Sequence, residues 1–185
     1  RYLKQRGYAL RGVEIGEEPD GQYVSPEDYG ALYLQTANAL QAVDPTVTLG
    51  GPSFQSLWDE PMMAWSGTEA QPEYPWLSRF LTYLTQRKRL ADLGFLSFEW
   101  YPFDDVCAPP ARLLRQAPAQ LVSAINTLYR QGLPRNVPLY MTEYGYSAFS
   151  TQAEVDLTGA LFNADTVGTF LTLGGASAYL YGYEP

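Results

Sequence analysis

Short β-type runs alternate along this chain with helical segments, and this alternation limits the fold more than any other feature. Five runs are predicted as strands, at 10–15, 46–49, 95–101, 139–145 and 176–181. Helical patterns separate them, and no two runs are joined by the turn residues of a β-hairpin. Strands that are connected through helices form parallel sheets with right-handed crossovers. We therefore predict a single α/β domain with a five-stranded parallel sheet.

Local signals predict where several helices begin and end. Ser25 and Pro26 have the residue types of an N-cap and a first helical position, and Asp44-Pro45 stops the apolar stripe that follows. Further helices are predicted around 76–84, up to Gly132, and over 155–173.

Two connections stand out between these elements. Gly50-Gly51-Pro52 follows the run 46–49, and it predicts a sharp turn where that strand ends. Residues 53–74 show no helical or strand period and are rich in large apolar side chains. A loop of that length in a compact domain is usually functional, so we expect a rim over a site. Its large side chains are Trp58, Met62, Met63 and Trp65.

Glutamates recur where the predicted strands end. The sites of parallel α/β folds lie at the carboxyl ends of the strands, whether the sheet is open or closed. An ionised carboxylate taken from water is costly unless it is paired, so acids at a strand end favour function over packing. Glu18 and Glu143 suggest paired-carboxylate chemistry. The glutamates at or just past strand ends are Glu18, Glu99, Glu143 and Glu184.

Composition excludes several classes of function. The 185 residues contain no histidine, which removes Ser-His-Asp and Cys-His catalysis and histidine-ligated zinc. The formal net charge of −8 argues against a nucleic-acid surface, which needs clustered Lys and Arg. No run approaches the roughly 20 apolar residues of a membrane span. We expect neither nucleic acid nor a membrane as a partner.

Aromatic residues make up 15% of the chain, with 15 Tyr and 4 Trp. A tyrosine-rich core and surface would account for this. Stacking on sugar rings, whose C–H faces suit aromatic planes, would account for it equally well. Composition alone leaves both explanations open.

Motifs at the ends of four predicted strands occur together in one order: Glu-Ile-Gly-Glu-Glu-Pro at 14–19, Gly-Gly-Pro at 50–52, Phe-Glu-Trp-Tyr-Pro at 98–102 and the run at 139–145. They resemble strand ends of the clan A retaining glycoside hydrolases. The first is similar to the end of strand four of that clan, and the second to the end of strand five in several of its families. Residues 98–102, Phe-Glu-Trp-Tyr-Pro, resemble strand six, and 139–145 resemble strand seven. The motifs occur in the order of the clan, with helices between them.

The resemblance implies a (β/α)8 TIM barrel, of which residues 1–185 form a single partial catalytic domain with about strands four to eight. A complete barrel usually takes about 250 residues. The chain begins at Arg1 without an initiator methionine or a signal peptide. We therefore expect the N-terminal half of the barrel to be missing from this chain or supplied elsewhere.

The resemblance also implies a reaction. Glu18 matches the general acid/base and Glu143 the nucleophile of a double displacement on a carbohydrate substrate. Retaining enzymes hold these carboxyls about 5–5.5 Å apart, with one ionised and the other protonated. Tyr101 resembles the tyrosine that donates a hydrogen bond to the nucleophile. No metal and no cofactor are implied. The positions expected to bind substrate are Glu17, Glu99, Trp100, Tyr101, Tyr144 and Tyr181.

Two positions depart from the pattern of the clan. Glu17 stands where an asparagine is expected, and Glu99 stands where a histidine is common. Each adds negative charge, which raises the pKa of neighbouring carboxyls. Such a site suits a cationic sugar, or it belongs to a carbohydrate-binding barrel that has lost catalysis.

A third reading from another class is a magnesium-dependent barrel enzyme that binds the ion through strand-end glutamates. Such sites often pair the metal with a lysine base. The lysines here are Lys4 and Lys88, and neither lies at a predicted strand end.

Other residues have simpler interpretations. Glu14 faces away from Ile15, and we expect it to pair with an arginine inside the barrel. Asp104-Asp105 is interpreted as a loop turn and Cys107 as an inert thiol. The basic cluster 87–89 suits the last turn of a helix, where cations complement the dipole.

Overall fold

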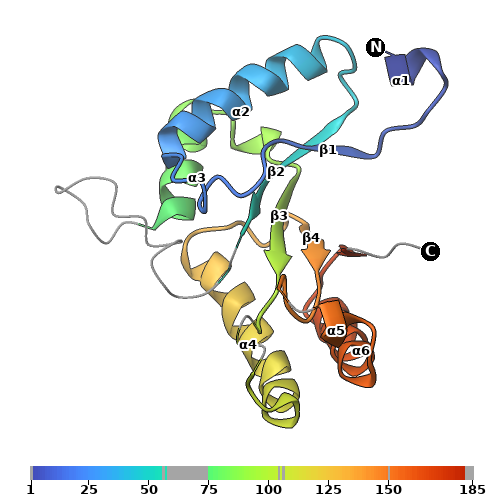
Figure 1. The fold of residues 1–185 in the computed structure, drawn as a ribbon. Coiled ribbons are helices and arrows are strands. Elements are labelled where there is room, and N and C mark those ends of the chain that lie inside the picture. The colour runs from blue at the N-terminus through green and yellow to red at the C-terminus, as the bar shows by residue number, and fades with distance from the viewer. Residues whose placement is uncertain are drawn as a thin grey trace.

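A computed structural model describes residues 2–55, 57, 75–103, 105, 107–149 and 151–181. Within these residues, five parallel strands form one sheet in the order β1-β2-β3-β4-β5 (Figure 1). This confirms the predicted parallel α/β sheet. The strands are β1 (Gly12–Glu14), β2 (Thr48–Phe54), β3 (Phe95–Trp100), β4 (Leu139–Tyr144) and β5 (Ser177–Leu180).

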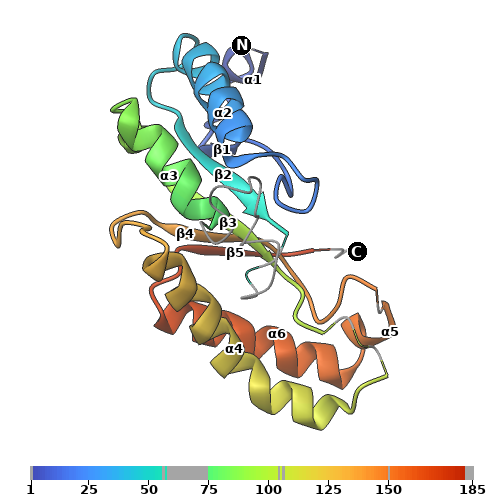
Figure 2. The same ribbon diagram turned by 90° about the vertical axis from the view of Figure 1, so that its left-hand side faces the viewer.

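The helices form two pairs around the sheet. Helices α2 and α3 lie side by side next to β1 and β2, and α4 and α6 lie side by side further along the curved sheet, next to β4 and β5 (Figures 1 and 2). No helix of the described ranges is both long and apolar enough to cross a membrane. The helical elements are α1 (Tyr2–Gln5), α2 (Pro26–Gln41), α3 (Trp76–Gln86), η1 (Leu90–Asp92), α4 (Pro110–Arg130), α5 (Thr151–Glu154) and α6 (Leu157–Thr172).

Side-chain caps fix the starts of α2 and α6. The Ser25 side chain accepts from the Asp28 backbone amide at 3.0 Å, and Pro26 takes the first helical position, as predicted. Asp156 caps α6 by accepting from the Thr158 and Gly159 amides. Each cap satisfies amides that have no partner within the helix.

Aromatic side chains fill the space between the sheet and each pair of helices. Near β2, Tyr29 of α2 packs against Trp76 and Phe80 of α3, with ring centroids 5.3 and 5.0 Å apart. Under β3, Phe98 meets Phe170 of α6 edge to face at 5.8 Å. These rings are buried, so one face of the sheet is covered by helices and is apolar.

The opposite face of the sheet has a different composition. Where β3 begins, the Phe95 ring stacks on Tyr140 of the neighbouring strand, with ring centroids 4.3 Å apart. A Cβ atom added to Gly12 or Gly50 would lie 3.1 or 2.3 Å from the Phe95 ring. The two glycines therefore leave the room that this large ring occupies, as small and large side chains do in a barrel interior.

Strand β2 runs past the point where the sequence predicted a turn. That prediction was wrong: Gly50, Gly51 and Pro52 lie inside β2, with a cis peptide bond between Gly51 and Pro52. The Ile15 amide donates to the Gly50 carbonyl oxygen at 2.8 Å, so β1 continues to pair with this stretch. The register shifts just beyond Pro52, and the extra residue is Ser53, whose φ is 55°. The glycines serve close packing in the strand and do not end it.

Candidate functional site

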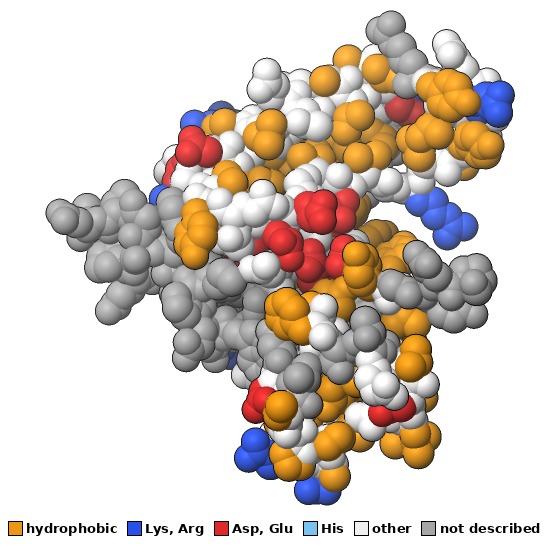
Figure 3. Space-filling model, viewed as in Figure 1, with side chains coloured by type: hydrophobic (Ala, Val, Ile, Leu, Met, Phe, Trp, Pro, Cys, Tyr) orange, Lys and Arg blue, Asp and Glu red, His pale blue; other side chains and the backbone are white. Residues whose placement is uncertain are grey.

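Three strand-end glutamates lie near one another at the carboxyl edge of the sheet. Glu18 follows β1, Glu99 lies in β3, and Glu143 lies in β4, where it is the register partner of Glu99. The charges of Glu18 and Glu143 both act on Glu99. Figure 3 shows acidic side chains gathered near the middle of this face. The structure thus brings together the glutamates that the motifs singled out.

A β-bulge directs Glu143 toward Glu99. Phe98 pairs with Met141 and Glu99 pairs with Glu143, so Thr142 is an extra residue on β4. Strict alternation would turn neighbouring side chains to opposite faces. Thr142 donates to Glu14 on the polar face, and the bulge lets the next residue project toward that same face. The irregularity therefore places two consecutive polar side chains in the site.

Glu143 accepts one hydrogen bond from the neighbouring strand end. The Tyr101 hydroxyl donates to its Oε2 atom at 3.0 Å. Partial burial raises the pKa of the Glu143 carboxyl, the hydrogen bond from Tyr101 lowers it, and the charges of Glu17, Glu18 and Glu14 raise it further. Burial and the Glu143 charge in turn raise the pKa of the Tyr101 phenol, so it stays a donor. Tyr101 holds the carboxylate in place and favours its ionised form.

Glu99 is the most buried carboxyl of the cluster, with 4% of its surface exposed. Burial and the charges of Glu143 and Glu18 raise its pKa to about 9. The Ser53 hydroxyl lies 3.2 Å from its Oε1 atom and donates to it when the carboxyl is ionised. At neutral pH the protonated form of Glu99 is therefore favoured, and Glu143 beside it keeps its charge more easily.

The loop after β1 holds Glu18 through its backbone. The Glu18 amide donates to the Ser53 carbonyl oxygen at 2.9 Å, and the φ of Glu18 is 47°. Few non-glycine residues adopt this left-handed conformation, and strain of this kind gathers at functional sites. Glu17 beside it is exposed, so its charge reaches the site from the solvent side.

Sequence reasoning missed Asp20. Only 1% of its surface is exposed, and its Oδ1 atom accepts from the Gln55 amide at 3.1 Å. Its Oδ2 atom has no hydrogen-bond partner among the described residues. Burial raises the pKa of Asp20 to about 6, against hydrogen bonds from the amides of Gln55, Asp20 and Gly21 that lower it. Asp20 ties the loop of Glu18 to the end of β2.

The aromatic residues predicted to bind substrate fall into two groups. Tyr101 and Tyr181 pack edge to face with centroids 6.2 Å apart, and Tyr181 is 62% exposed. Trp100 and Tyr144 are buried in the hydrophobic core, with 1% and 7% of their surfaces exposed. Tyr101 and Tyr181 therefore have surface to offer a ligand. The roles of all four in binding stay predictions.

The prediction that Glu14 pairs with an arginine was wrong for the described part of the chain. Its Oε1 atom accepts from the Thr142 hydroxyl at 3.0 Å, and none of the ion pairs between described residues includes Glu14. Asp105 caps a turn by accepting from the Cys107 amide, and Cys107 is an exposed free thiol. Among the described residues, no group of three or more His, Cys, Asp or Glu side chains could hold a metal ion. Of the aromatic rim predicted over 53–74, residues 56 and 58–74 lie outside the described residues, as do Asp104 and Glu184.

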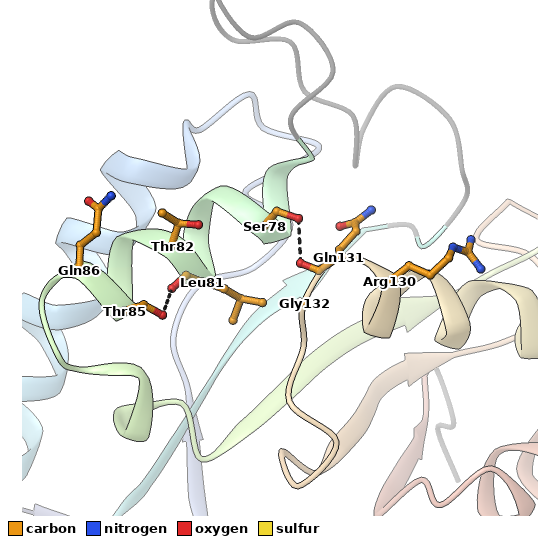
Figure 4. A pocket seen from close by; sticks show the side chains of 8 residues that line it. All are labelled: Ser78, Leu81, Thr82, Thr85, Gln86, Arg130, Gln131 and Gly132. Carbon is orange, nitrogen blue, oxygen red and sulfur yellow. Dashed lines mark hydrogen bonds between the residues drawn. The ribbon is translucent and has the colours of Figure 1, made fainter.

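A separate pocket lies between α3 and the end of α4 (Figure 4). Its volume is about 370 Å³, and the Ser78 hydroxyl donates to the Gln131 carbonyl oxygen at 2.8 Å across it. None of the strand-end glutamates lines it, so it is distinct from the carboxylate cluster. It is lined by Ser78, Leu81, Thr82, Thr85, Gln86, Arg130, Gln131 and Gly132.

Comparison with known proteins identifies one relative in sequence. No family model matches the chain. The chain is 26% identical over 149 residues to a protein named Beta-xylosidase from Geobacillus stearothermophilus. That alignment covers 72% of this chain and 26% of the relative. The chain thus spans about a quarter of the curated relative it matches.

Solved structures match the fold over most of the chain. The endoglucanase Cel44A of glycoside hydrolase family 44 from Clostridium thermocellum aligns over 97% of this chain and 45% of its own, with a TM-score of 0.69 and 18% identity. A glucosidase from Croceicoccus marinus aligns over 90% of this chain and 31% of its own, with a TM-score of 0.56 and 22% identity. A mannanase from Thermotoga petrophila aligns with a TM-score of 0.51 and 15% identity over 92% of this chain and 43% of its own. These likenesses show a five-stranded parallel α/β half-barrel, consistent with part of a TIM barrel.

Proposed function

We propose, on the premise that the homologues of this chain are glycoside hydrolases, that it carries the catalytic edge of a retaining glycosidase. The observation that supports this most directly is the pairing of Glu143 with Tyr101 at 3.0 Å beside a second strand-end carboxyl, Glu18. A nucleophilic carboxylate must be ionised and fixed in orientation, and a phenol donor serves both needs. The relative named Beta-xylosidase makes xylosides the first substrates to test.

In this proposal Glu143 attacks the anomeric carbon while Glu18 protonates the leaving oxygen. A glycosyl-enzyme ester forms at Glu143, and the glycosidic C–O bond breaks. Glu18, now ionised, then takes a proton from water, which attacks the anomeric carbon and releases Glu143. Water and the sugar are the only co-reactants.

The same proposal places residues 1–185 in about strands four to eight of a (β/α)8 barrel, as one partial catalytic domain. Two observations support it: the matched solved structures extend well beyond the aligned part, and the sheet has strands β1 and β5 at its two edges. An N-terminal half, in the same protein or supplied elsewhere, would pair with those edges and complete the substrate cleft. The substrate is a carbohydrate, and no metal or cofactor takes part in these steps.

Covalent trapping tests the assignment. The full-length protein is incubated with 2-deoxy-2-fluoro glycosyl fluorides, beginning with the xylosyl compound, and then digested for mass spectrometry. Fluorine at carbon 2 destabilises the oxocarbenium-like transition states, so the ester accumulates when a retaining nucleophile is present. We expect a stable mass gain on the peptide that contains Glu143.

Two variants sharpen this experiment. Glu143→Gln should abolish both labelling and turnover, because the amide cannot form the ester. Asp28→Asn removes an exposed acid from α2 and should leave labelling unchanged. A label on another residue would overturn the role of Glu143. A folded full-length protein that binds sugars in calorimetry without label or hydrolysis would instead be a carbohydrate-binding barrel.

A further inference from the structure

A continuous row of oxygen atoms joins two carboxyls across the polar face of the sheet. Thr142 Oγ1 lies 3.0 Å from Glu14 Oε1 and 3.3 Å from Ser53 Oγ. Ser53 Oγ in turn lies 3.2 Å from Glu99 Oε1. The row runs from β1 through β4 and β2 to β3, so it crosses four of the strands.

The number of protons in this row does not match the number of contacts when both carboxyls are ionised. The three contacts need three protons, and the Ser53 and Thr142 hydroxyls supply one each. With Thr142 donating to Glu14 and Ser53 donating to Glu99, the 3.3 Å contact between the hydroxyl oxygens has no proton in it. A carboxyl proton fills this gap. Glu99 then donates to Ser53, Ser53 to Thr142, and Thr142 to Glu14.

The surroundings favour such a proton. The other titratable groups that act on Glu99 are Glu143 on β4, through its charge, and Glu18 on the β1–α2 loop, through its charge and a side-chain hydrogen bond. Glu99 in turn acts on the Tyr101 phenol. All of these are acids. The ion pairs between described residues join Lys4, Arg79 and Arg89 to acids elsewhere, so none of them offsets the charge of the row. Ser53 and Glu99 are both buried, so water competes little for these hydrogen bonds.

We propose that Glu14 and Glu99 share one proton through Thr142 and Ser53. Glu14, Thr142 and Ser53 are then positioning residues that keep Glu99 a neutral hydrogen-bond donor. Nothing in the glycosidase steps above assigns a part to Glu14, Ser53 or Thr142. A carboxyl that is kept neutral beside reacting carboxyls can donate a hydrogen bond where an ionised one could only repel.

This inference rests on the proposed function for its purpose, although its test does not. A neutral Glu99 adds no charge to the crevice, so Glu143 ionises more easily for its attack. Since Glu143 is the register partner of Glu99, the charge of Glu99 would otherwise oppose that of the nucleophile directly.

Carbon-13 NMR of the full-length protein, labelled at the glutamate side-chain carboxyl carbons, measures the protonation of Glu99 directly. Resonances are assigned with Glu14→Gln and Glu99→Gln, and then titrated in the wild type, in Thr142→Val and in Thr142→Ser. Thr142→Val changes no charge, and it leaves the Ser53 hydroxyl free to donate to ionised Glu99. We expect its Glu99 midpoint to fall by about one pH unit or more, and Thr142→Ser to restore the wild-type midpoint.

The sign of the shift separates this proposal from simple burial. An apolar valine near a buried carboxyl would raise its pKa by desolvation alone. A midpoint that rises or stays unchanged in Thr142→Val would therefore overturn the shared proton, as would wild-type Glu99 titrating near the ordinary value for glutamate. Because the readout is a resonance and not turnover, a protein without glycosidase activity still decides the question.

Discussion

Tyr101 Oη lies 3.0 Å from Glu143 Oε2, and this contact joins the segment after β3 to the end of β4. The two residues are 42 positions apart in the chain. The phenol donates only to the carboxylate form, so it lowers the pKa of Glu143 against the burial and the neighbouring charges that raise it. The balance between these opposing effects can be measured.

Tyr101→Phe removes the donor and keeps the ring. The pKa of Glu143 should rise, so the acidic limb of kcat/KM should move to higher pH by about one unit. Activity at the optimum should fall about tenfold or more, since the carboxylate also loses its orientation. The measurement is a pH–rate profile of the full-length protein on an aryl xyloside or another substrate found by trapping.

Tyr181→Phe is the matched control. Tyr181 packs edge to face on Tyr101, and it is not among the groups that shift the pKa of Glu143. The acidic limb of kcat/KM in Tyr181→Phe should coincide with that of the wild type, even if KM changes. A limb that stays in place in Tyr101→Phe would show that Glu143 is not the ionising group.

Asp20 makes stability depend on pH. Its pKa is about 6 in the fold against 3.8 in the unfolded chain, so the folded state holds its proton more tightly. The contribution of Asp20 to stability is thus fully present below about pH 4 and is lost as the pH rises through about 6. Asp20→Asn should remove this dependence. The free energy of unfolding of the wild type relative to the variant should fall by at most about 3 kcal/mol across that window.

Denaturant unfolding at several pH values between those limits measures the effect. Asp28→Asn, at an exposed acid of α2, should give a difference from the wild type that stays flat over the same window. A flat difference for Asp20→Asn would mean that its carboxyl is not held in a proton-favouring environment.

Local signals were enough to predict most of the elements. The caps at Ser25 and Pro26 and the apolar stripe of α3 act over a few residues, so they are visible in the sequence. Gly50-Gly51-Pro52 misled because its residue types match those of a turn. A distant side chain decides its conformation: the Phe95 ring takes the space above Gly50, and β1 pairs with its carbonyl oxygen.

The candidate site could be predicted as far as strand ends determine it. Glu99 and Glu143 were found because parallel strands bring their carboxyl ends to one edge. Asp20 was missed because a Pro-Asp-Gly turn does not reveal that its acid is buried against Gln55, 35 positions away. The partner of Glu14 was also out of reach, since Thr142 is 128 positions away and meets it only through a bulge.

Gly50 should tolerate no side chain. A Cβ atom there would lie 2.3 Å from the Phe95 ring, which is stacked on Tyr140 and has little freedom to move. Gly50→Ala should lower the free energy of unfolding by about 1–3 kcal/mol through overpacking. Gly168 lies within α6, and a Cβ there would meet nothing within 4 Å. Gly168→Ala should instead raise stability by about 0.5–1 kcal/mol. Denaturant titration compares the two, and equal effects would contradict the packing described around Phe95.

Glu17 should act on Glu143 only through its charge. It is exposed, and it raises the pKa of Glu143 without a hydrogen bond to it. Glu17→Gln should therefore move the acidic limb of kcat/KM to lower pH by a few tenths of a unit, opposite in sign to Tyr101→Phe. Screening distinguishes the two variants further, because the Debye length falls from about 10 Å at 0.1 M salt to about 3 Å at 1 M. The shift in Glu17→Gln should vanish at high salt, whereas the shift in Tyr101→Phe should persist, since a direct hydrogen bond is little screened. A Glu17→Gln shift that survives 1 M salt would mean that Glu17 contacts the site directly.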